Sequence, residues 1–236
     1  MFIPIQFSYL KISIFAQCLL KAYFNSTNNI LLTPIHYYFK KQMDKLDELR
    51  SIVDSCNRCD LRKGCTHVVF GEGARQAKIM CIGEGPGYYE DQMGRPFVGA
   101  SGKLLDKILE VCGFSRQKNV FIGNIVKCRP PGNRDPFPEE RQACLPYILK
   151  QIELINPSII ILLGATALKG LIHPDLSITR TRGKWIEWNN RLVMPTFHPS
   201  ALLRNSKLKY DAWEDFKKVI DKYREIVDST HYCKYH

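Results

Sequence analysis

From Met43 onward, short apolar runs alternate with segments of helical periodicity. The apolar runs predict strands over residues 78–82, 119–127, 158–163 and 191–196, and the helical patterns cover 44–53, 103–111, 138–155, 165–171 and 210–227. A near-continuous run of Ile and Leu, as in 159–163, is typical of a strand buried on both faces of a parallel sheet. Asn189 and Asn190 predict a turn before the last strand. The fold class we predict is a three-layer α/β/α domain with a central, mainly parallel sheet.

The first 42 residues do not share this pattern. They contain no acidic residue, and their apolar positions follow neither a helical nor a strand period. We therefore expect one domain over residues 43–236, preceded by an extension, residues 1–42, that is not part of the core. One hypothesis is that this extension is a non-native leader that arises from an upstream start codon.

Composition adds an expectation about partners. The chain has 236 residues, enough for one domain with a sizeable core, and 34 Lys and Arg against 23 Asp and Glu give a net charge of +11. This charge favours a polyanionic partner such as nucleic acid, although an ordinary basic protein has the same balance. The longest apolar region, residues 1–24, is interrupted by Lys11 and Lys21 and resembles neither a membrane span nor a signal peptide. We expect a cytoplasmic protein with no membrane contact.

Candidate functional residues occur where three of the predicted strands end. A glycine-rich loop, residues 82–102, follows the first strand and carries Glu84, Glu90 and Phe97. Asn124 lies near the end of the second strand, and His198 follows the last one. Ligand sites of open parallel sheets lie at the carboxyl edge, so these segments should converge. Taken singly, a histidine after a strand is often a structural hydrogen-bonding group, and an asparagine there is often a turn or a cap.

Cysteines form a second signal. Cys56 and Cys59 make a C-x2-C pair after a helix, and Cys128 and Cys144 lie farther along the chain. Four thiolates at such positions can hold a zinc ion or a [4Fe–4S] cluster, and the spacing does not decide between them. Cys65 competes as a ligand because of its closeness to the C-x2-C pair. Burial without any ligand role explains the remaining cysteines with apolar neighbours well: Cys18, Cys81 and Cys112.

Several short motifs, each weak alone, occur together in one order. They are C-x2-C, Val69-Phe70-Gly71-Glu72-Gly73, GEGPG-x-x-ED from Gly83, Gly94-x-Pro96-Phe97-Val98-Gly99, Asn124-x-Val126-Lys127-Cys128-Arg129-Pro130-Pro131, Asn133-Arg134, Cys144, and His198-Pro199-Ser200-Ala201-Leu202-Leu203-Arg204. In this combination the chain resembles the family 4 uracil-DNA glycosylases, the iron–sulfur branch of the uracil-DNA glycosylase superfamily. The resemblance runs from about Cys56 to Arg204 and leaves residues 1–42 without a counterpart.

The resemblance implies an enzyme of base excision repair. It would flip uracil out of DNA and hydrolyse the N-glycosidic bond, leaving an abasic site. The implied cofactor is a structural [4Fe–4S] cluster on Cys56, Cys59, Cys128 and Cys144, with zinc as the alternative and Cys65 left over. Uracil-containing DNA is the implied partner, and we expect a monomer.

The resemblance also implies roles in the pocket. Phe97 would stack on the base, and Asn124 would pair with N3–H and O4 of uracil, groups that cytosine reverses. Glu90 would crowd C5 and so exclude thymine. His198 would stabilise the negative charge that develops on O2.

Two assignments are less direct. Glu84 would orient or activate the attacking water, although other branches carry an acidic residue one position later, where this chain has the substrate-binding candidate Gly85. Leu202, Leu203 and Arg204 would enter the DNA minor groove as an apolar wedge with a cation beside it. The alternative for the two leucines is a place in the core.

Three rival interpretations explain less of the sequence. A relative that traps uracil covalently through a histidine in an arginine-rich insertion is disfavoured, since this chain has no such insertion around Arg129-Pro130-Pro131. A non-catalytic nucleic-acid-binding module does not account for the intact Glu84, Phe97, Asn124 and His198. A zinc-binding structural protein accounts for the cysteines but not for the motifs at the strand ends.

Overall fold

The computed structural model describes residues 45–236. The expectations for the extension over residues 1–42 therefore fall on residues outside the described part of the chain. The first described element is a helix over residues 45–54, which buries Leu46, Leu49 and Val53. Among the described helices, none is long and apolar enough to cross a lipid bilayer.

The described chain forms a six-stranded sheet in the order β1-β3-β2-β4-β6-β5. Its strands are β1 Glu72–Gly73, β2 Ile79–Gly83, β3 Val120–Asn124, β4 Ile159–Leu163, β5 Ile186–Trp188 and β6 Arg191–Thr196. The four inner strands pair in parallel, and the two short edge strands β1 and β5 pair antiparallel with their neighbours. The carboxyl ends of the four parallel strands therefore meet at one edge, as the sequence pattern predicts.

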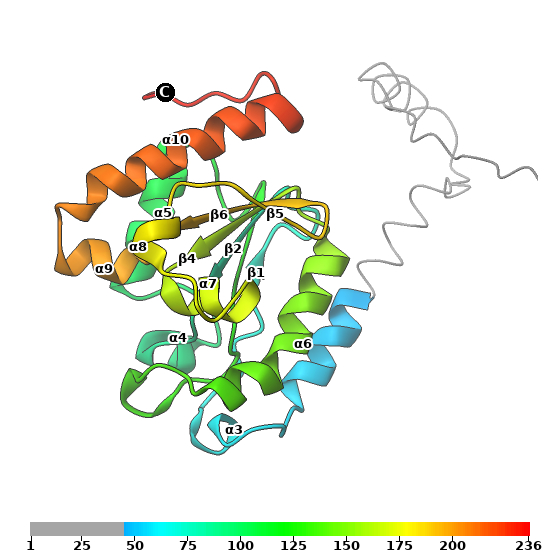
Figure 1. Ribbon diagram of the computed structural model, residues 1–236. Helices are drawn as coiled ribbons and strands as arrows, with labels where there is room; N and C mark the ends of the chain where they lie inside the picture. The colour runs from blue at the N-terminus through cyan, green and yellow to red at the C-terminus, as the bar shows by residue number, and fades with distance from the viewer. Residues whose placement is uncertain (1–44) are drawn as a thin grey trace, which may run out of the picture. The chain divides into compact units, whose positions relative to one another are not determined.

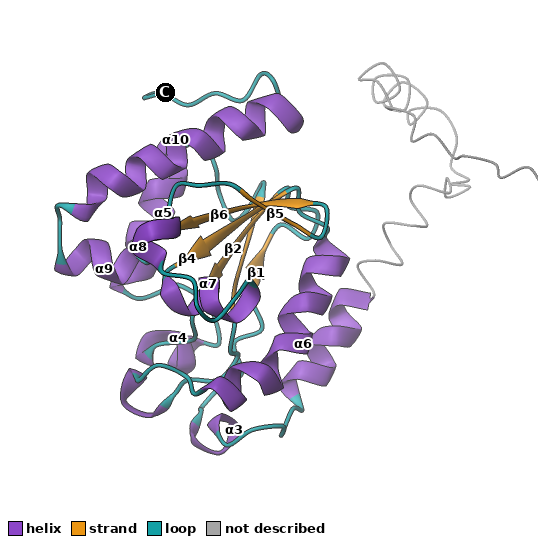
Figure 2. Ribbon diagram, viewed as in Figure 1, coloured by secondary structure: helices purple, strands orange, loops and turns teal. Residues whose placement is uncertain are grey.

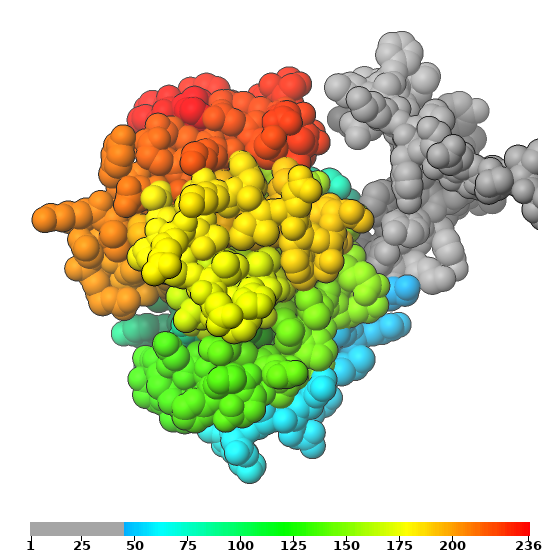
Figure 3. Space-filling view, in the orientation of Figure 1, coloured from blue at the N-terminus to red at the C-terminus, as the bar shows by residue number. Residues whose placement is uncertain are grey.

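Helices cover both faces of the sheet (Figure 1). On one face α5 (Ala100–Val111) and α10 (Leu208–Ile226) pack through Leu105, Leu109 and Phe216 onto alternate strand residues such as Ile79. On the other face lie α6 (Pro138–Ile155), α7 (Ala165–Leu171) and the helix over residues 45–54. Alternation along each strand assigns its odd and even residues to the two cores, because successive side chains point to opposite faces. This is the predicted three-layer α/β/α fold; the layers are distinct in Figure 2, and Figure 3 shows α10 closing the top of the domain.

The segments with the strongest periodicity form elements with the predicted bounds, whereas several short elements are not predicted by the pattern. The ranges 138–155, 165–171 and 191–196 coincide with α6, α7 and β6. Asn189 and Asn190 have φ of 48° and 59° and form the turn between β5 and β6. The short elements that the pattern does not predict are β1, α3 (Leu61–Gly64), α4 (Tyr88–Met93), the 3-10 turn η1 (Pro131–Asn133), α8 (Ile178–Thr181) and α9 (Pro199–Arg204). Most of them flank the carboxyl edge of the sheet.

Candidate active site

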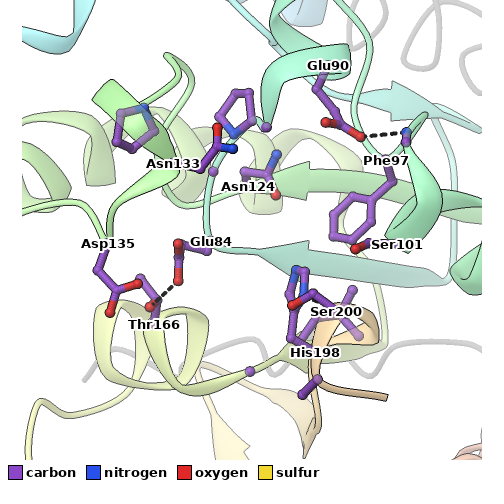
Figure 4. A pocket seen from close by; sticks show the side chains of 18 of the residues that line it. Glu84, Glu90, Phe97, Ser101, Asn124, Asn133, Asp135, Thr166, His198 and Ser200 are labelled. Carbon is purple, nitrogen blue, oxygen red and sulfur yellow. Dashed lines mark hydrogen bonds between the residues drawn. The ribbon is translucent and has the colours of Figure 1, made fainter. Parts of the chain in front are cut away.

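A cavity of about 670 Å³ opens at the carboxyl edge of the sheet, a size usual for small-molecule sites. Glu84 follows β2, Asn124 ends β3, and His198 follows β6, while Phe97 comes from the segment between α4 and α5. All four line this cavity (Figure 4). The structure thus brings together the residues that the sequence places at three separate strand ends.

Two glycines at strand ends make this convergence possible. A Cβ atom on Gly83 would lie 2.6 Å from Oδ1 of Asn124 and 2.7 Å from Cζ of Phe97. Gly164, which follows β4, has φ of +92°, and a Cβ atom there would lie 2.9 Å from Cβ of His198. Any larger residue at either position would push a pocket side chain away, so the glycines set the width of the site.

Asn124 presents an unpaired acceptor. The residue is 1% exposed, and its Oδ1 has no hydrogen-bond partner among the described residues. Buried polar groups are nearly always paired, and one without a partner costs about 1–3 kcal/mol. A ligand in the cavity with a hydrogen-bond donor would pair with this oxygen, so Asn124 has the properties of a group that recognises a bound molecule.

Phe97 is held in an unusual backbone conformation. Its φ is +52°, in the left-handed region that aromatic residues rarely occupy. The turn also needs Gly102, because a Cβ atom there would lie 2.0 Å from the carbonyl carbon and oxygen of Phe97. The ring is buried at 6% exposure, and its centroid lies 5.6 Å from that of His198. The two rings therefore form neighbouring walls of the cavity (Figure 4).

His198 is a neutral hydrogen-bond donor in this setting. It caps α9, and its Nδ1 accepts a hydrogen bond from the Ser200 backbone N–H at 3.1 Å. Burial, with a contribution from Arg204, lowers the pKa of His198 to about 4. A neutral ring whose Nδ1 is an acceptor carries its proton on Nε2. His198 can therefore donate to a developing anion without itself being charged.

Glu84 lies across the cavity from Phe97 and His198 (Figure 4). Its Oε2 accepts a hydrogen bond from Oγ1 of Thr166 at 2.5 Å. Burial raises the pKa of Glu84 above its ordinary value, Asp135 adds to this effect, and the Thr166 hydrogen bond opposes it. A carboxylate with a raised pKa and one fixed hydrogen bond has the character of a group that orients or deprotonates water.

Glu90 and Gly85 shape the rest of the wall. Oε1 of Glu90, from α4, accepts hydrogen bonds from the backbone N–H groups of Val98 and Gly99, both at 2.8 Å. These bonds fix the carboxylate beside Phe97 and at the start of α5. A Cβ atom on Gly85 would lie 2.6 Å from Val126, so the backbone there also packs closely.

The four expected cysteine ligands line a second, smaller cavity. Cys56 and Cys59 are partly buried, Cys128 and Cys144 are each 8% exposed, and all four border the same space. Burial raises the pKa of Cys144 to about 11, and burial together with Cys65 raises that of Cys128. Within the described chain, no three Cys, His, Asp or Glu side chains are grouped as they would be around a single metal ion. Cys65 lies near Cys128 but does not border the cavity.

A buried lysine connects this cavity to the pocket. Nζ of Lys127 donates to the carbonyl of Asn124 at 2.9 Å and to Oε1 of Gln151 at 2.6 Å. Burial lowers the pKa of Lys127 to about 8. Lys127 is therefore an internal group rather than a surface cation, and it ties the segment of Cys128 to the end of β3.

The predicted DNA wedge is divided between the interior and the surface. Its residues form α9, in which Leu202 is 2% exposed whereas Leu203 is 49% exposed. Arg204 is also exposed. Leu202 therefore occupies the core, as in the alternative interpretation, and Leu203 and Arg204 remain available for contact with DNA.

The sequence did not single out Thr166 or Ser200, although both hold predicted site residues in place. A hydroxyl residue two positions after the glycine that follows β4, in Gly164-Ala165-Thr166, was the available signal for Thr166. Its partner lies 82 positions away in the sequence, so only the fold reveals the pair.

Comparison with known proteins identifies relatives of the whole domain. Residues 70–217 match the model of the uracil DNA glycosylase superfamily. The chain is 48% identical over 181 residues to a type-4 uracil-DNA glycosylase of Thermotoga maritima, covering 73% of this chain and 94% of that protein. Type-4 enzymes of Sulfurisphaera tokodaii and Saccharolobus solfataricus are 46% and 47% identical, each over 75% of this chain and over 84% and 86% of the relatives.

Proposed function

The chain belongs to the type-4 branch of the uracil DNA glycosylase superfamily, and from this premise we propose that it removes uracil from DNA by hydrolysing the N-glycosidic bond. The observation that carries the proposal is the unpaired Oδ1 of the buried Asn124 in a cavity walled by Phe97 and His198. Uracil supplies the donor that this oxygen lacks, and the abasic site left behind is an intermediate of base excision repair.

Uracil is selected because its hydrogen-bond donor and acceptor match those of the Asn124 amide. Oδ1 of Asn124 accepts from uracil N3–H, and its amide nitrogen donates to O4. Cytosine presents an acceptor at N3 and a donor at N4, so both contacts become unfavourable. Thymine matches the polarity and differs by its C5 methyl group; the carboxylate of Glu90, fixed by two backbone N–H groups, supports a steric role against that methyl.

In the chemical step the bond between C1′ and N1 breaks, and its electron pair leaves with uracil. Nε2–H of His198 donates to O2 as negative charge develops there, and a preorganised donor of this kind contributes typically about 10²–10³ in rate. Glu84 orients the water that adds to C1′ and accepts its proton. Uracil N1 takes a proton from solvent, which completes the hydrolysis.

The donor set of the second cavity fits an iron–sulfur cluster. Four cysteines, Cys56, Cys59, Cys128 and Cys144, would hold it, and a positively charged centre would favour the thiolate forms that burial alone opposes. When bound, the cluster supplies a covalent cross-link between the segment near residue 56 and the loop after β3. Through Lys127 this loop supports Asn124, so the cluster would act on the geometry of the pocket.

DNA is the proposed partner, and the exposed Leu203 and Arg204 beside the cavity are the proposed groove contacts. An apolar side chain can fill the space that a flipped base leaves, with a cation on the adjacent phosphate. One chain is enough to form the whole proposed pocket, and we propose that the protein acts as a monomer.

The test is cleavage of a labelled oligonucleotide with one central uracil, followed by alkali to break the strand at any abasic site. We expect a break with uracil and none when thymine or cytosine takes its place. Iron, sulfide and zinc are measured on the same preparation. No break on single- or double-stranded substrate, from protein with a full complement of metal, would favour the non-catalytic binding module.

A further inference from the structure

Arg116 is a buried charged residue for which the proposed mechanism has no use. It follows α5, is 6% exposed, and lies outside every motif in the sequence. Burying a guanidinium is unfavourable unless its N–H groups are paired. The partners of Arg116 therefore indicate what it does.

Two of those partners are the carbonyl groups on either side of the strained turn. Nη1 of Arg116 donates to the Pro96 carbonyl at 3.0 Å, and Nη2 donates to the Phe97 carbonyl at 3.0 Å. These oxygens flank the residue whose φ is +52°. A non-glycine residue in a sparsely populated conformation persists only when its surroundings fix it. Arg116 supplies such fixation directly to the backbone of Phe97.

Carboxylates fix the arginine in turn. Oδ1 of Asp106, on α5, accepts from Nε at 3.0 Å and from Nη2 at 2.8 Å, and Glu72 lies 3.7 Å away. Glu72 is itself bound by Arg95, through Nε at 2.6 Å and Nη2 at 2.8 Å. Residues of α5 and β1 thus hold the guanidinium in place. Its hydrogen bonds to the Pro96 and Phe97 carbonyls fix the turn relative to these two elements.

We infer that Arg116 is a positioning residue for the reaction, which holds the Phe97 ring where a flipped base can stack on it. The inference rests on the proposed function, because it concerns the same pocket. Arg116 touches neither Asn124, Glu84 nor His198 by any hydrogen bond in the described structure. Its most direct route to the reaction is the backbone of Phe97, and a double-mutant cycle can test whether its effect passes through that residue.

The cycle compares Arg116→Met, Phe97→Ala and the double variant by single-turnover excision of uracil from an oligonucleotide. Loss of an aromatic stack on a base should slow excision roughly tenfold or more. Arg116→Met should slow the wild-type background by a similar factor. In the Phe97→Ala background, Arg116→Met should change the rate by less than about twofold. A change of this size is within the scatter with which the effects of independent substitutions add. A full and equal loss in both backgrounds would overturn the inference.

Two further variants keep the test meaningful if Arg116→Met does not fold. Asp106→Asn removes one carboxylate partner from a half-exposed position, and its smaller loss of rate should likewise vanish in the Phe97→Ala background. Arg224→Met is the matched control: its guanidinium also donates to two backbone carbonyls, those of His231 and His236, but it lies outside the pocket and the Phe97 turn, so its loss should leave the rate unchanged. A rate loss for Arg224→Met equal to that of Asp106→Asn would contradict the inference.

The two proposals fail in different ways. If the wild-type protein excises no uracil, the proposed function fails and the cycle has no baseline. If the wild-type protein is active but the effects of Arg116 and Phe97 multiply, the proposed function stands and the positioning role does not. Inhibition by free uracil gives an independent readout, since Arg116→Met should weaken it together with Phe97→Ala, whereas a loss of thermal stability alone would leave it unchanged.

Discussion

Replacing Asn124 with alanine should separate activity from stability. The side chain is 1% exposed and lines the cavity, and its Oδ1 has no protein partner within the described chain. Removing the amide oxygen breaks no hydrogen bond to another described residue, while the flipped uracil loses both of its polar partners. The substitution should therefore lower activity far more than stability.

The magnitude follows from the two lost contacts. Each unmatched buried group costs about 1–3 kcal/mol, so N3–H and O4 of uracil together cost about 2–6 kcal/mol in the variant. At about 1.36 kcal/mol per factor of ten, kcat/KM should fall by a factor between roughly 30 and roughly 25,000. Discrimination against cytosine should fall with it, because the variant no longer distinguishes the two polarities.

The assay is uracil excision under single-turnover conditions together with thermal unfolding of the same preparations. Asn133→Ala is the matched control: Asn133 lines the same cavity, but its Oδ1 already accepts from Nε of Arg129 at 2.7 Å. An exposed position of this kind should change the rate by no more than about twofold. If Asn124→Ala lowered the unfolding temperature by many degrees and left discrimination intact, Asn124 would be a structural residue and the reasoning would be refuted.

Other consequences concern pH, specificity and the cysteines. The pKa of Glu84 is raised, so activity should fall as pH drops through that pKa and the carboxylate is protonated. Glu84→Gln should flatten this limb of the pH–rate profile. Thr166→Val should move the limb to higher pH, because the lost hydrogen bond favours the ionised form of Glu84. His198→Ala should slow single-turnover excision by about 10²–10³ without weakening DNA binding measured by anisotropy. Glu90→Ala should allow excision of thymine from a T·G mismatch in the same oligonucleotide assay, and no gain there would contradict its role against the C5 methyl. Cys144→Ser should lower bound iron and sulfide and the unfolding temperature together; unchanged iron would exclude it as a ligand.

The architecture and the convergence of the site could be predicted because they depend on strong local signals. Buried strands such as β4 have a continuous apolar pattern, and polar residues directly after them must lie at the carboxyl edge of a parallel sheet. The family resemblance then connected Asn124 and His198 with a pocket. The strand ends and long helices needed no knowledge of tertiary contacts.

What the sequence did not reveal depends on contacts between distant segments. The pairing of Thr166 with Glu84 and the support of the Phe97 turn by Arg116 each join residues far apart in the chain. Leu202 and Leu203 are adjacent and chemically identical, so sequence alone treats them alike. The helical phase of α9 decides that one is buried and the other exposed.

The pocket is also where the domain departs from local rules of protein structure. Phe97 has a left-handed backbone, and Asn124 leaves an acceptor unpaired. The surroundings hold both residues in place: Arg116 and Gly102 support the turn, and Lys127 and the strand ladder support the end of β3. Natural sequences tend to retain such departures where function requires them. The Phe97 ring and Oδ1 of Asn124 face the same cavity, so a flipped base would stack on the ring and pair with the amide. The same two residues would therefore bind the base and hold it in position for the reaction.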